Sequence, residues 1–484
     1  MKKTTKNLLI MAAVLIVLGG AAAALLLLPS GEGEIESSSA PSPQVSTVEM
    51  EALTDLTGED VTAISVKNSE DSFSFVPEGE DFTLEGYEDY DINSVSVSSS
   101  VKVLLSMKPS KALGSRDDLQ NFGLAGKDAV QVEIACKDGS VQKLALGSAA
   151  GESAGRYVLK DDEVYIVSSI SDLLYGSKFA YFSTFLYSVA DRTQTVTDSN
   201  GSISTETLSD LLYDITLSGS NFPEEVNIGY NEDVLSAYLM TSPVRAESGN
   251  AALETLISSL KAPSADAVVA AGLTDEVLEE YGLDEPFAKA DFTLNSASHT
   301  MTVSGLDADN NRYLLLDDKD VVYRIAQSAV SGWAEANPMK LRMGYIWLAN
   351  IKDVQQLTLT VEGDMVYRFD ITRTLDEERS TEDVPQYDLT IKNAGGNDVV
   401  YESYQKFYQN LIGTAVMTIE PADYSDTPLL RVEYSYFEGA EKNTVEFFLA
   451  ENDRCVALLD GVFNGVVRKA DVDKVIDQLV EVHG

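Results

Sequence analysis

The stretch that decides the fold runs Ser115-Arg-Asp-Asp-Leu119-Gln-Asn-Phe122-Gly123-Leu124, and it returns as Thr274-Asp-Glu-Val-Leu278-Glu-Glu-Tyr281-Gly282-Leu283. In both copies a Ser or Thr suited to an N-cap begins a short helix. A Gly suited to the left-handed position after a helix then ends it, and an apolar residue follows. The recurrence predicts a chain built from repeated units of roughly 140 to 160 residues.

Matching strands follow each copy of this short helix. Apolar and polar residues alternate there with period two, and turn residues separate the runs, which is typical of antiparallel strands that bury one face. The matching positions are Val130, Val132 and Ile134 with Ala290, Phe292 and Leu294, Gly147 with Gly305, Arg156-Tyr157 with Arg312-Tyr313, Asp161-Asp162 with Asp317-Asp318, and Val164-Tyr165 with Val322-Tyr323.

A third, less regular copy closes the chain. Leu430, Val432 and Tyr434 alternate, and residues 445–449 supply the second strand. The pair Arg454-Cys455 stands where the other copies have Arg-Tyr, so Cys455 is interpreted as a core residue of a strand. The Gly-Leu turn is missing from this copy. A terminal helix is predicted over residues 471–482, with one apolar face.

Two strands and a helix precede the strand group in every copy. Apolar residues three and four positions apart give each of these helices one buried stripe. Helices on one face of antiparallel sheets make an α+β architecture. We expect it three times, over residues 56–200, 205–345 and 350–484. The predicted buried stripes are Val97, Val101, Leu104 and Leu105, then Leu253, Leu256, Ile257 and Leu260, then Tyr404, Phe407, Tyr408 and Leu411.

Residues 1–55 have a different composition from the rest. Lysines precede an uncharged apolar run over residues 8–28, which reaches roughly 30 Å as a helix, the thickness of a hydrocarbon core. The positive-inside bias places residues 1–7 in the cytoplasm and the bulk outside. We expect a signal anchor that crosses a bacterial cell membrane once, and then a Ser/Pro/Gly/Glu-rich tether over residues 29–55. A signal peptide cleaved near Ala21 to Ala24 is the alternative.

Charge excludes one class of partner. The chain has 78 Asp and Glu against 35 Lys and Arg, a formal net charge of -43. A surface of that sign repels phosphate backbones, so we expect no nucleic acid partner. Cations, basic peptides and basic proteins are compatible with it, and so is a role in solubility alone.

Residues suited to catalysis or metal binding are scarce. Two cysteines, Cys136 and Cys455, and two histidines, His299 and His483, make neither a disulfide framework nor a zinc cluster. No P-loop, H-E-x-x-H or G-x-S-x-G motif occurs. His299 is interpreted as an exposed strand or turn residue. We therefore predict no catalytic, cofactor or metal site, and no enzyme.

Two weaker patterns leave alternatives open. The acidic loop Asp307-Ala-Asp309-Asn310-Asn311 suits either Ca²⁺ or an ordinary β-turn, but it lacks the Gly and Glu that an EF-hand requires. Arg156, Arg312 and Arg454 recur at one repeat position, as a salt bridge inside each repeat or as a carboxylate-binding group.

The N-terminal anchor, the aromatic-Gly-Leu turn, the strand that ends at Gly147 and the Arg-Tyr then Val-Tyr strands occur together. In this combination the chain resembles the bacterial domain-of-unknown-function family 4340, over most of residues 60–345. Members of that family are often associated with ABC-type export systems of the gliding-motility-auxiliary kind. The resemblance implies an accessory of an ABC transporter, with permease subunits as partners, and it brings no catalytic residues.

The leading hypothesis is a membrane-anchored, extracytoplasmic interaction protein that is accessory to an ABC-type export complex. A cell-envelope protein that binds cations, basic peptides or glycan is the second hypothesis, and an unrecognised enzyme is the third. Exposed aromatic residues near the junctions would supply contact energy. Trp333, Tyr345 and Trp347 are the first candidates for this, with burial between the units as the alternative.

Overall fold

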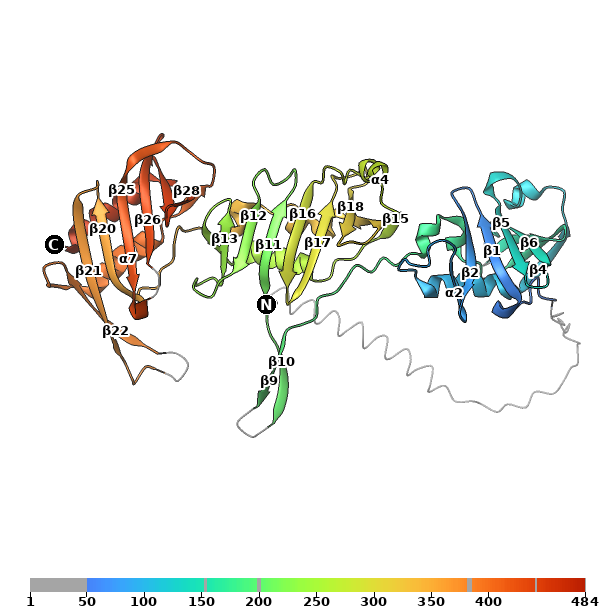
Figure 1. The fold of residues 1–484 in the computed structure, drawn as a ribbon, viewed down its shortest axis with the longest axis horizontal. Helices are drawn as coiled ribbons and strands as arrows, with labels where there is room; N and C mark the ends of the chain where they lie inside the picture. The colour runs from blue at the N-terminus through green and yellow to red at the C-terminus, as the bar shows by residue number, and fades with distance from the viewer. Residues whose placement is uncertain (1–49, 152–154, 198–201, 381–384, 440–441, 484) are drawn as a thin grey trace, which may run out of the picture. The chain divides into compact units, whose positions relative to one another are not determined.

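The computed structural model describes residues 50–151, 155–197, 202–380, 385–439 and 442–483 (Figure 1). The predicted cytoplasmic tail, the anchor and most of the tether lie outside these ranges. No helix in the described ranges is both long enough and apolar enough to cross a bilayer.

Sheet 1 contains eight antiparallel strands in the order β3-β2-β1-β5-β6-β7-β8-β4. Its strands are β1 (Val61–Lys67), β2 (Ser72–Glu78), β3 (Asp81–Leu84), β4 (Pro109–Ser115), β5 (Val130–Cys136), β6 (Val141–Ala149), β7 (Arg156–Lys160) and β8 (Glu163–Val167).

Sheet 2 contains nine strands in the order β14-β13-β12-β11-β16-β17-β18-β19-β15. Its strands are β11 (Leu212–Ser218), β12 (Val226–Tyr230), β13 (Tyr238–Ser242), β14 (Ala246–Ser248), β15 (Ala267–Ala271), β16 (Ala288–Leu294), β17 (Ala297–Val303), β18 (Asn311–Leu316) and β19 (Val321–Ala326).

Sheet 3 also contains nine strands, in the order β23-β22-β21-β20-β25-β26-β27-β28-β24. Its strands are β20 (Val354–Val361), β21 (Met365–Leu375), β22 (Tyr387–Asn393), β23 (Asp398–Val399), β24 (Val416–Thr418), β25 (Tyr424–Tyr436), β26 (Asn443–Ala450), β27 (Arg454–Leu459) and β28 (Val462–Arg468).

The three sheets share one connection pattern. A meander leads outward from the first strand, and a helix then connects it to an edge strand on the far side of the sheet. A second, four-stranded meander begins beside the first strand and ends next to that edge strand. The predicted α+β class with antiparallel sheets is therefore confirmed.

The connecting helices are α2 (Ser94–Leu105), α3 (Ala251–Lys261) and α7 (Tyr401–Ile412). Every residue predicted for their apolar faces is buried, except the half-buried Ile257. Two further helices, α5 (Gln327–Ala334) and α8 (Lys469–His483), follow the last strands of sheets 2 and 3. In these sheets the two helices contact each other and the same sheet, so they cover one face together.

The Gly-Leu turn forms as predicted in sheets 1 and 2. Gly123 and Gly282 both adopt φ +64°, in the left-handed region that favours glycine. The N–H of Leu124 donates to the carbonyl of Leu119 (3.0 Å), and the N–H of Leu283 donates to that of Leu278 (2.8 Å). Both bonds are the six-to-one bond of a Schellman motif. The helix before the turn is the 3₁₀ helix η2 (Leu119–Phe122) in sheet 1 and α4 (Asp275–Glu280) in sheet 2.

Strand pairing corrects two positions in the sequence alignment. Arg156 pairs with Val167 and Arg312 with Ile325, and the residue at this place in sheet 3 is Cys455, which pairs with Val467. The prediction that Arg454 is the third recurring arginine is therefore wrong by one residue. The pairing also matches Gly147 with Ser304 and not with Gly305. Leu146, which precedes Gly147, pairs with Val158, and Val303, which precedes Ser304, pairs with Leu314 at the same place in sheet 2.

The remaining elements connect the sheets or fill turns. The hairpin of β9 (Thr193–Thr197) and β10 (Ile203–Thr207) lies in the connection between sheets 1 and 2 and was not expected from the sequence (Figure 1). The short elements are η1 (Gly58–Asp60), η3 (Gly126–Asp128), η4 (Asp172–Tyr175), η5 (Lys178–Tyr181), α6 (Pro338–Leu341) and η6 (Phe437–Gly439).

Candidate functional site

A shallow hollow of about 320 Å³ lies on sheet 2, and His299 is among its lining residues. Strands β11, β16 and β17 supply most of its lining, and the alternate residues Asp214, Thr216, Asp291, Thr293, Ser298 and Thr300 share one face of the sheet. The hollow is mainly polar. Its lining residues are Asp214, Thr216, Asp291, Phe292, Thr293, Ser298, His299, Thr300 and Asp317.

His299 is held on two sides. Its Nδ1 lies 2.9 Å from Oδ2 of Asp317, and its ring stacks on that of Tyr187 at a centroid distance of 3.9 Å. The His299 side chain is 16% exposed, so the prediction of a strand residue is right and that of an exposed side chain is wrong. Burial raises the pKa of the Tyr187 hydroxyl, and the Asp317 charge adds to this shift.

A nucleophile is not aligned with this histidine. Ser298 is its neighbour on the strand, and consecutive side chains of a strand point to opposite faces. The Ser298 hydroxyl lies 3.1 Å from the hydroxyl of Thr293. In the part of the chain that the structure describes, no hydroxyl is hydrogen-bonded to His299, so the hollow does not present the arrangement of nucleophile and base that acyl transfer requires.

The histidine and aspartate instead fix a turn, and sheet 3 contains the same device. Asp317 and Asp460 have φ of +49° and +52°, and each accepts a 2.8 Å hydrogen bond from the N–H of a threonine, Thr300 or Thr444. The second carboxylate oxygen of Asp460 accepts from Nδ2 of Asn443 at 3.0 Å. Asn443 therefore takes the place of His299, which assigns His299 a role in the turn.

An aromatic residue supports this device in sheet 3 as well. The Tyr436 hydroxyl donates to Oδ1 of Asn443 at 2.9 Å, and Nε1 of Trp347 donates to the Tyr436 hydroxyl at 2.9 Å. Burial raises the pKa of Tyr436 to about 12. Tyr436 thus contacts Asn443 in sheet 3 by a hydrogen bond, where Tyr187 contacts His299 in sheet 2 by stacking, and Trp347 holds the Tyr436 hydroxyl.

The predicted aromatic contact anchors are mostly not exposed. Trp333 is 0% exposed within α5, and Trp347 is 8% exposed. Tyr345 is half-buried. Trp333 and Trp347 are therefore core side chains, as the alternative of burial expected, and they do not serve as exposed anchors.

The recurring arginines form internal salt bridges in two sheets. Arg312 is 2% exposed, its Nη2 lies 2.7 Å from Glu335, and its guanidinium stacks on the Phe287 ring at 4.0 Å. Its Nη1 also donates to the Ser304 carbonyl at 2.7 Å. Because the guanidinium is almost fully buried and both of its Nη atoms have internal partners, Arg312 is not free to bind an external carboxylate.

Arg156 repeats the arrangement in sheet 1. It lies 2.6 Å from Asp172 and 4.0 Å above the Tyr175 ring, and it donates to the Gly147 carbonyl. In sheet 3, Arg454 is exposed and forms no ion pair with any described residue. The predicted salt bridge is therefore confirmed in sheets 1 and 2 and wrong in sheet 3.

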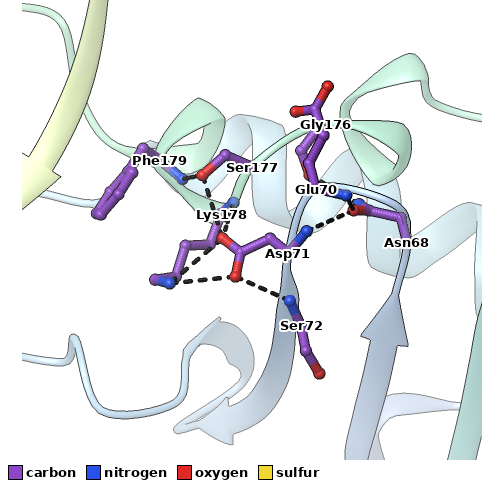
Figure 2. A network of polar contacts seen from close by, with 8 residues as sticks. All are labelled: Asn68, Glu70, Asp71, Ser72, Gly176, Ser177, Lys178 and Phe179. Carbon is purple, nitrogen blue, oxygen red and sulfur yellow. Dashed lines mark hydrogen bonds and ion pairs between the residues drawn. The ribbon is translucent and has the colours of Figure 1, made fainter.

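A polar network in sheet 1 fixes the segment that follows β8 (Figure 2). Asp71, next to the turn between β1 and β2, accepts from Ser177 Oγ at 3.1 Å and from the Lys178 N–H at 3.0 Å. The Lys178 ammonium lies 3.2 Å from the same carboxylate. Burial acts to raise the pKa of Asp71, but hydrogen bonds from the N–H groups of Lys178 and Ser72 and the Lys178 charge outweigh it and lower this pKa.

The acidic loop is an ordinary turn in this structure. Oδ1 of Asp307 accepts from the N–H groups of Asp309 (2.9 Å) and Asn311 (2.8 Å), and Asn310 has φ +61°. In the described ranges no group of three His, Cys, Asp or Glu side chains is placed to hold a metal ion. Cys136 and Cys455 are buried and unpaired, and burial raises the pKa of the Cys455 thiol to about 11.

The fold and these contacts define a class of protein: α+β, with three antiparallel sheets in which polar groups fix turns and helix ends. The family model described as Domain of unknown function (DUF4340) matches residues 83–198 and 239–411. This is more than half of the sequence, so the chain belongs to that family. No curated protein and no solved structure matches the chain.

Proposed function

We propose that this chain is an interaction protein held at the outer side of a bacterial cell membrane, where it serves an ABC-type export complex by contact. The family resemblance carries the link to export, since family members are often associated with such systems. In this proposal residues 8–28 form the single-pass anchor, the N-terminus is cytoplasmic, and three copies of one α+β unit follow the tether.

One observation supports a function by contact and not by catalysis. The polar pair that most resembles a catalytic pair, a histidine beside an aspartate, has a counterpart without a histidine at the equivalent place in another sheet. His299 and Asp317 in sheet 2 correspond to Asn443 and Asp460 in sheet 3. An asparagine cannot act as a general base, yet it holds the same turn. The pair is therefore explained by folding, and surface contact is the function that the remaining features support best.

A second candidate function is the binding of basic peptides, cations or glycan in the hollow on sheet 2. Asp214 lines this hollow, is exposed, and has no ion-pair partner among the described residues. Asp291 nearby is paired with Lys289 at 2.8 Å, so Asp214 is the acidic group open to a ligand. Titration of a lysine-rich peptide against the chain and its Asp214→Asn variant tests this candidate, which requires weaker binding by the variant.

The decisive experiment for the main proposal is crosslinking and co-purification of the full-length chain from its own membrane, alongside a His299→Asn variant. We expect both chains to recover the same permease. A chain that recovers no partner and loses its cellular role with His299→Asn would overturn the proposal. Protease added to intact, wall-stripped cells tests the topology, since it should remove everything beyond about residue 29. Protection of the sheets would contradict the proposed orientation.

A further inference from the structure

The first sheet has a free edge that differs in charge from the rest of the chain. Strand β4 pairs with β8 on one side, and no described residue forms a backbone hydrogen bond with its other side. A free edge presents unpaired N–H and C=O groups, which are a template for an added strand. Strand β4 has seven residues, whereas the edge strands at the same place in sheets 2 and 3, β15 and β24, have five and three.

This edge is basic in a strongly acidic protein. No Asp or Glu occurs between Ile92 and Arg116, although the chain contains 78 of them. Four cationic side chains lie at the end of α2, in the following turn, in β4 and directly after β4, and all are exposed. None forms an ion pair or a side-chain hydrogen bond with a described residue, which sets them apart from Arg156, Lys178 and Arg312. They are Lys102, Lys108, Lys111 and Arg116.

We propose that the free edge of β4 is a docking surface for an extended acidic segment of a partner protein, which adds to sheet 1 as a further strand. The inference deepens the proposed function and rests on its claim that the chain acts by contact. Backbone hydrogen bonds supply the binding energy, and the cations in and beside β4, chiefly Lys108 and Lys111, select acidic side chains on the added strand.

The shape of the edge limits the length of the segment. Strand β4 begins at Pro109, which lacks an N–H, and its pairing register shifts twice, between Pro109 and Lys111 and between Ala112 and Gly114. Such irregularities oppose pairing with a long, flat strand and so protect against aggregation. Beyond the first irregularity only residues 111–115 are left, and the second irregularity interrupts them, so the partner segment is short, about four residues.

The test uses the full-length chain in detergent and a nine-residue peptide of alternating glutamate and valine. We expect the peptide to slow hydrogen exchange at those amides of residues 110–115 that face away from β8. A lysine–valine peptide of the same length should have no effect. The double variant Lys108→Glu/Lys111→Glu should weaken binding of the acidic peptide about tenfold. The matched double variant Lys127→Glu/Lys137→Glu reverses two exposed charges near the ends of β5, away from β4, and should bind normally.

Three results would overturn the docking site. The first is binding of the acidic peptide without protection of residues 110–115, which would show attraction by charge alone. The second is slow exchange, before any peptide is added, at those amides of residues 110–115 that face away from β8, which would show that the edge is already occupied. The third is a membrane partner whose crosslinks map away from β4, which would keep the function by contact and reject this surface.

Discussion

Sheets 2 and 3 close the same turn with different side chains. In sheet 2 a histidine binds the turn aspartate, and an asparagine does so in sheet 3, while the backbone bond from threonine keeps the same length of 2.8 Å. This difference shows that the position requires only a side chain that can hydrogen-bond to the turn aspartate. It does not require the acid-base chemistry of a histidine. A lone histidine beside an aspartate is therefore not evidence of catalysis in this fold.

The two sheets also differ where the Gly-Leu turn packs against the strands of sheet 2. In sheet 2 the Gly-Leu turn packs Leu283 against Val322 and Ala270, and the Tyr281 and Tyr313 rings meet at 4.7 Å. Sheet 3 lacks the turn, and β25 extends over 13 residues in its place. Tyr424 remains 49% exposed there, with its ring 5.0 Å from that of Phe448. Loss of the turn thus leaves an aromatic side chain on the surface.

The largest expected effect on stability tests whether Gly147 and Gly305 occupy equivalent positions. A Cβ added to Gly147 would meet the carbonyl oxygen of Phe122 and the Leu124 side chain, whereas one added to Gly305 has no neighbour within 4 Å. We expect Gly147→Ala to cost about 3 kcal/mol and Gly305→Ala less than about 0.5 kcal/mol. Urea unfolding of the two variants measures this. Equal costs would show that the two glycines are equivalent after all.

The arginine position should give the next largest effect. Arg312→Leu leaves the buried Ser304 carbonyl without its Arg312 donor and removes the ion pair with Glu335, so we expect a loss of about 2 to 3 kcal/mol in the free energy of unfolding. Arg454→Leu, the matched change on the surface of sheet 3, should cost less than about 0.5 kcal/mol. Denaturant unfolding compares the two. A large cost at Arg454 would restore it as the third member of the set.

The turn histidine should show a smaller effect that depends on the substitute. His299→Ala removes the hydrogen bond to Asp317 and the stacking on Tyr187, at a cost of about 1 to 2 kcal/mol. His299→Asn should recover part of this loss, because Asn443 makes the same bond in sheet 3. Thermal unfolding of the two variants is the measurement. Equal destabilisation by both would mean that the equivalence of the two turns is wrong.

The smallest expected effect is a dependence of stability on pH. It arises in sheet 1, where the ion pair of Asp71 and Lys178 fixes the segment after the last strand, whereas a helix follows the last strand of sheets 2 and 3. The pKa of Asp71 is lowered by folding, so its stabilisation is present above the ordinary aspartate pKa and is lost as the pH falls through the folded value. Asp71→Asn should cost about 1 kcal/mol at pH 7 and nothing at low pH. Unfolding measured from pH 7 to pH 3 tests this, and a cost that stays constant would contradict it.

Local patterns predicted local features well. The Gly-Leu turns follow from Gly123 and Gly282, since only a left-handed residue ends a helix in this way. The face of α7 follows from the spacing of Tyr404, Phe407, Tyr408 and Leu411, all of which are buried. In both cases the residues that form the feature are close in sequence.

Features that depend on pairing across the sheet were harder to predict. Cys455 was aligned one residue away because Cys455, Val456 and Ala457 are all buried, so β27 shows no alternation that would fix its register. The candidate site was missed because the partners of His299, Tyr187 and Asp317, come from other elements. The pair Asn443 and Asp460 was the available signal, but it becomes visible only when the strands are paired.

The measurement that tests the central claim most directly is the crosslinking pattern of the full-length His299→Asn chain in its own membrane, recorded with its melting temperature. The claim is that the recurring polar residues hold the fold and that function lies in contact. It predicts the same crosslinked partners as the unmodified chain and a melting temperature close to it. Loss of the partners, or of the cellular role, at an unchanged melting temperature would contradict the claim, because His299 would then do more than fix a turn.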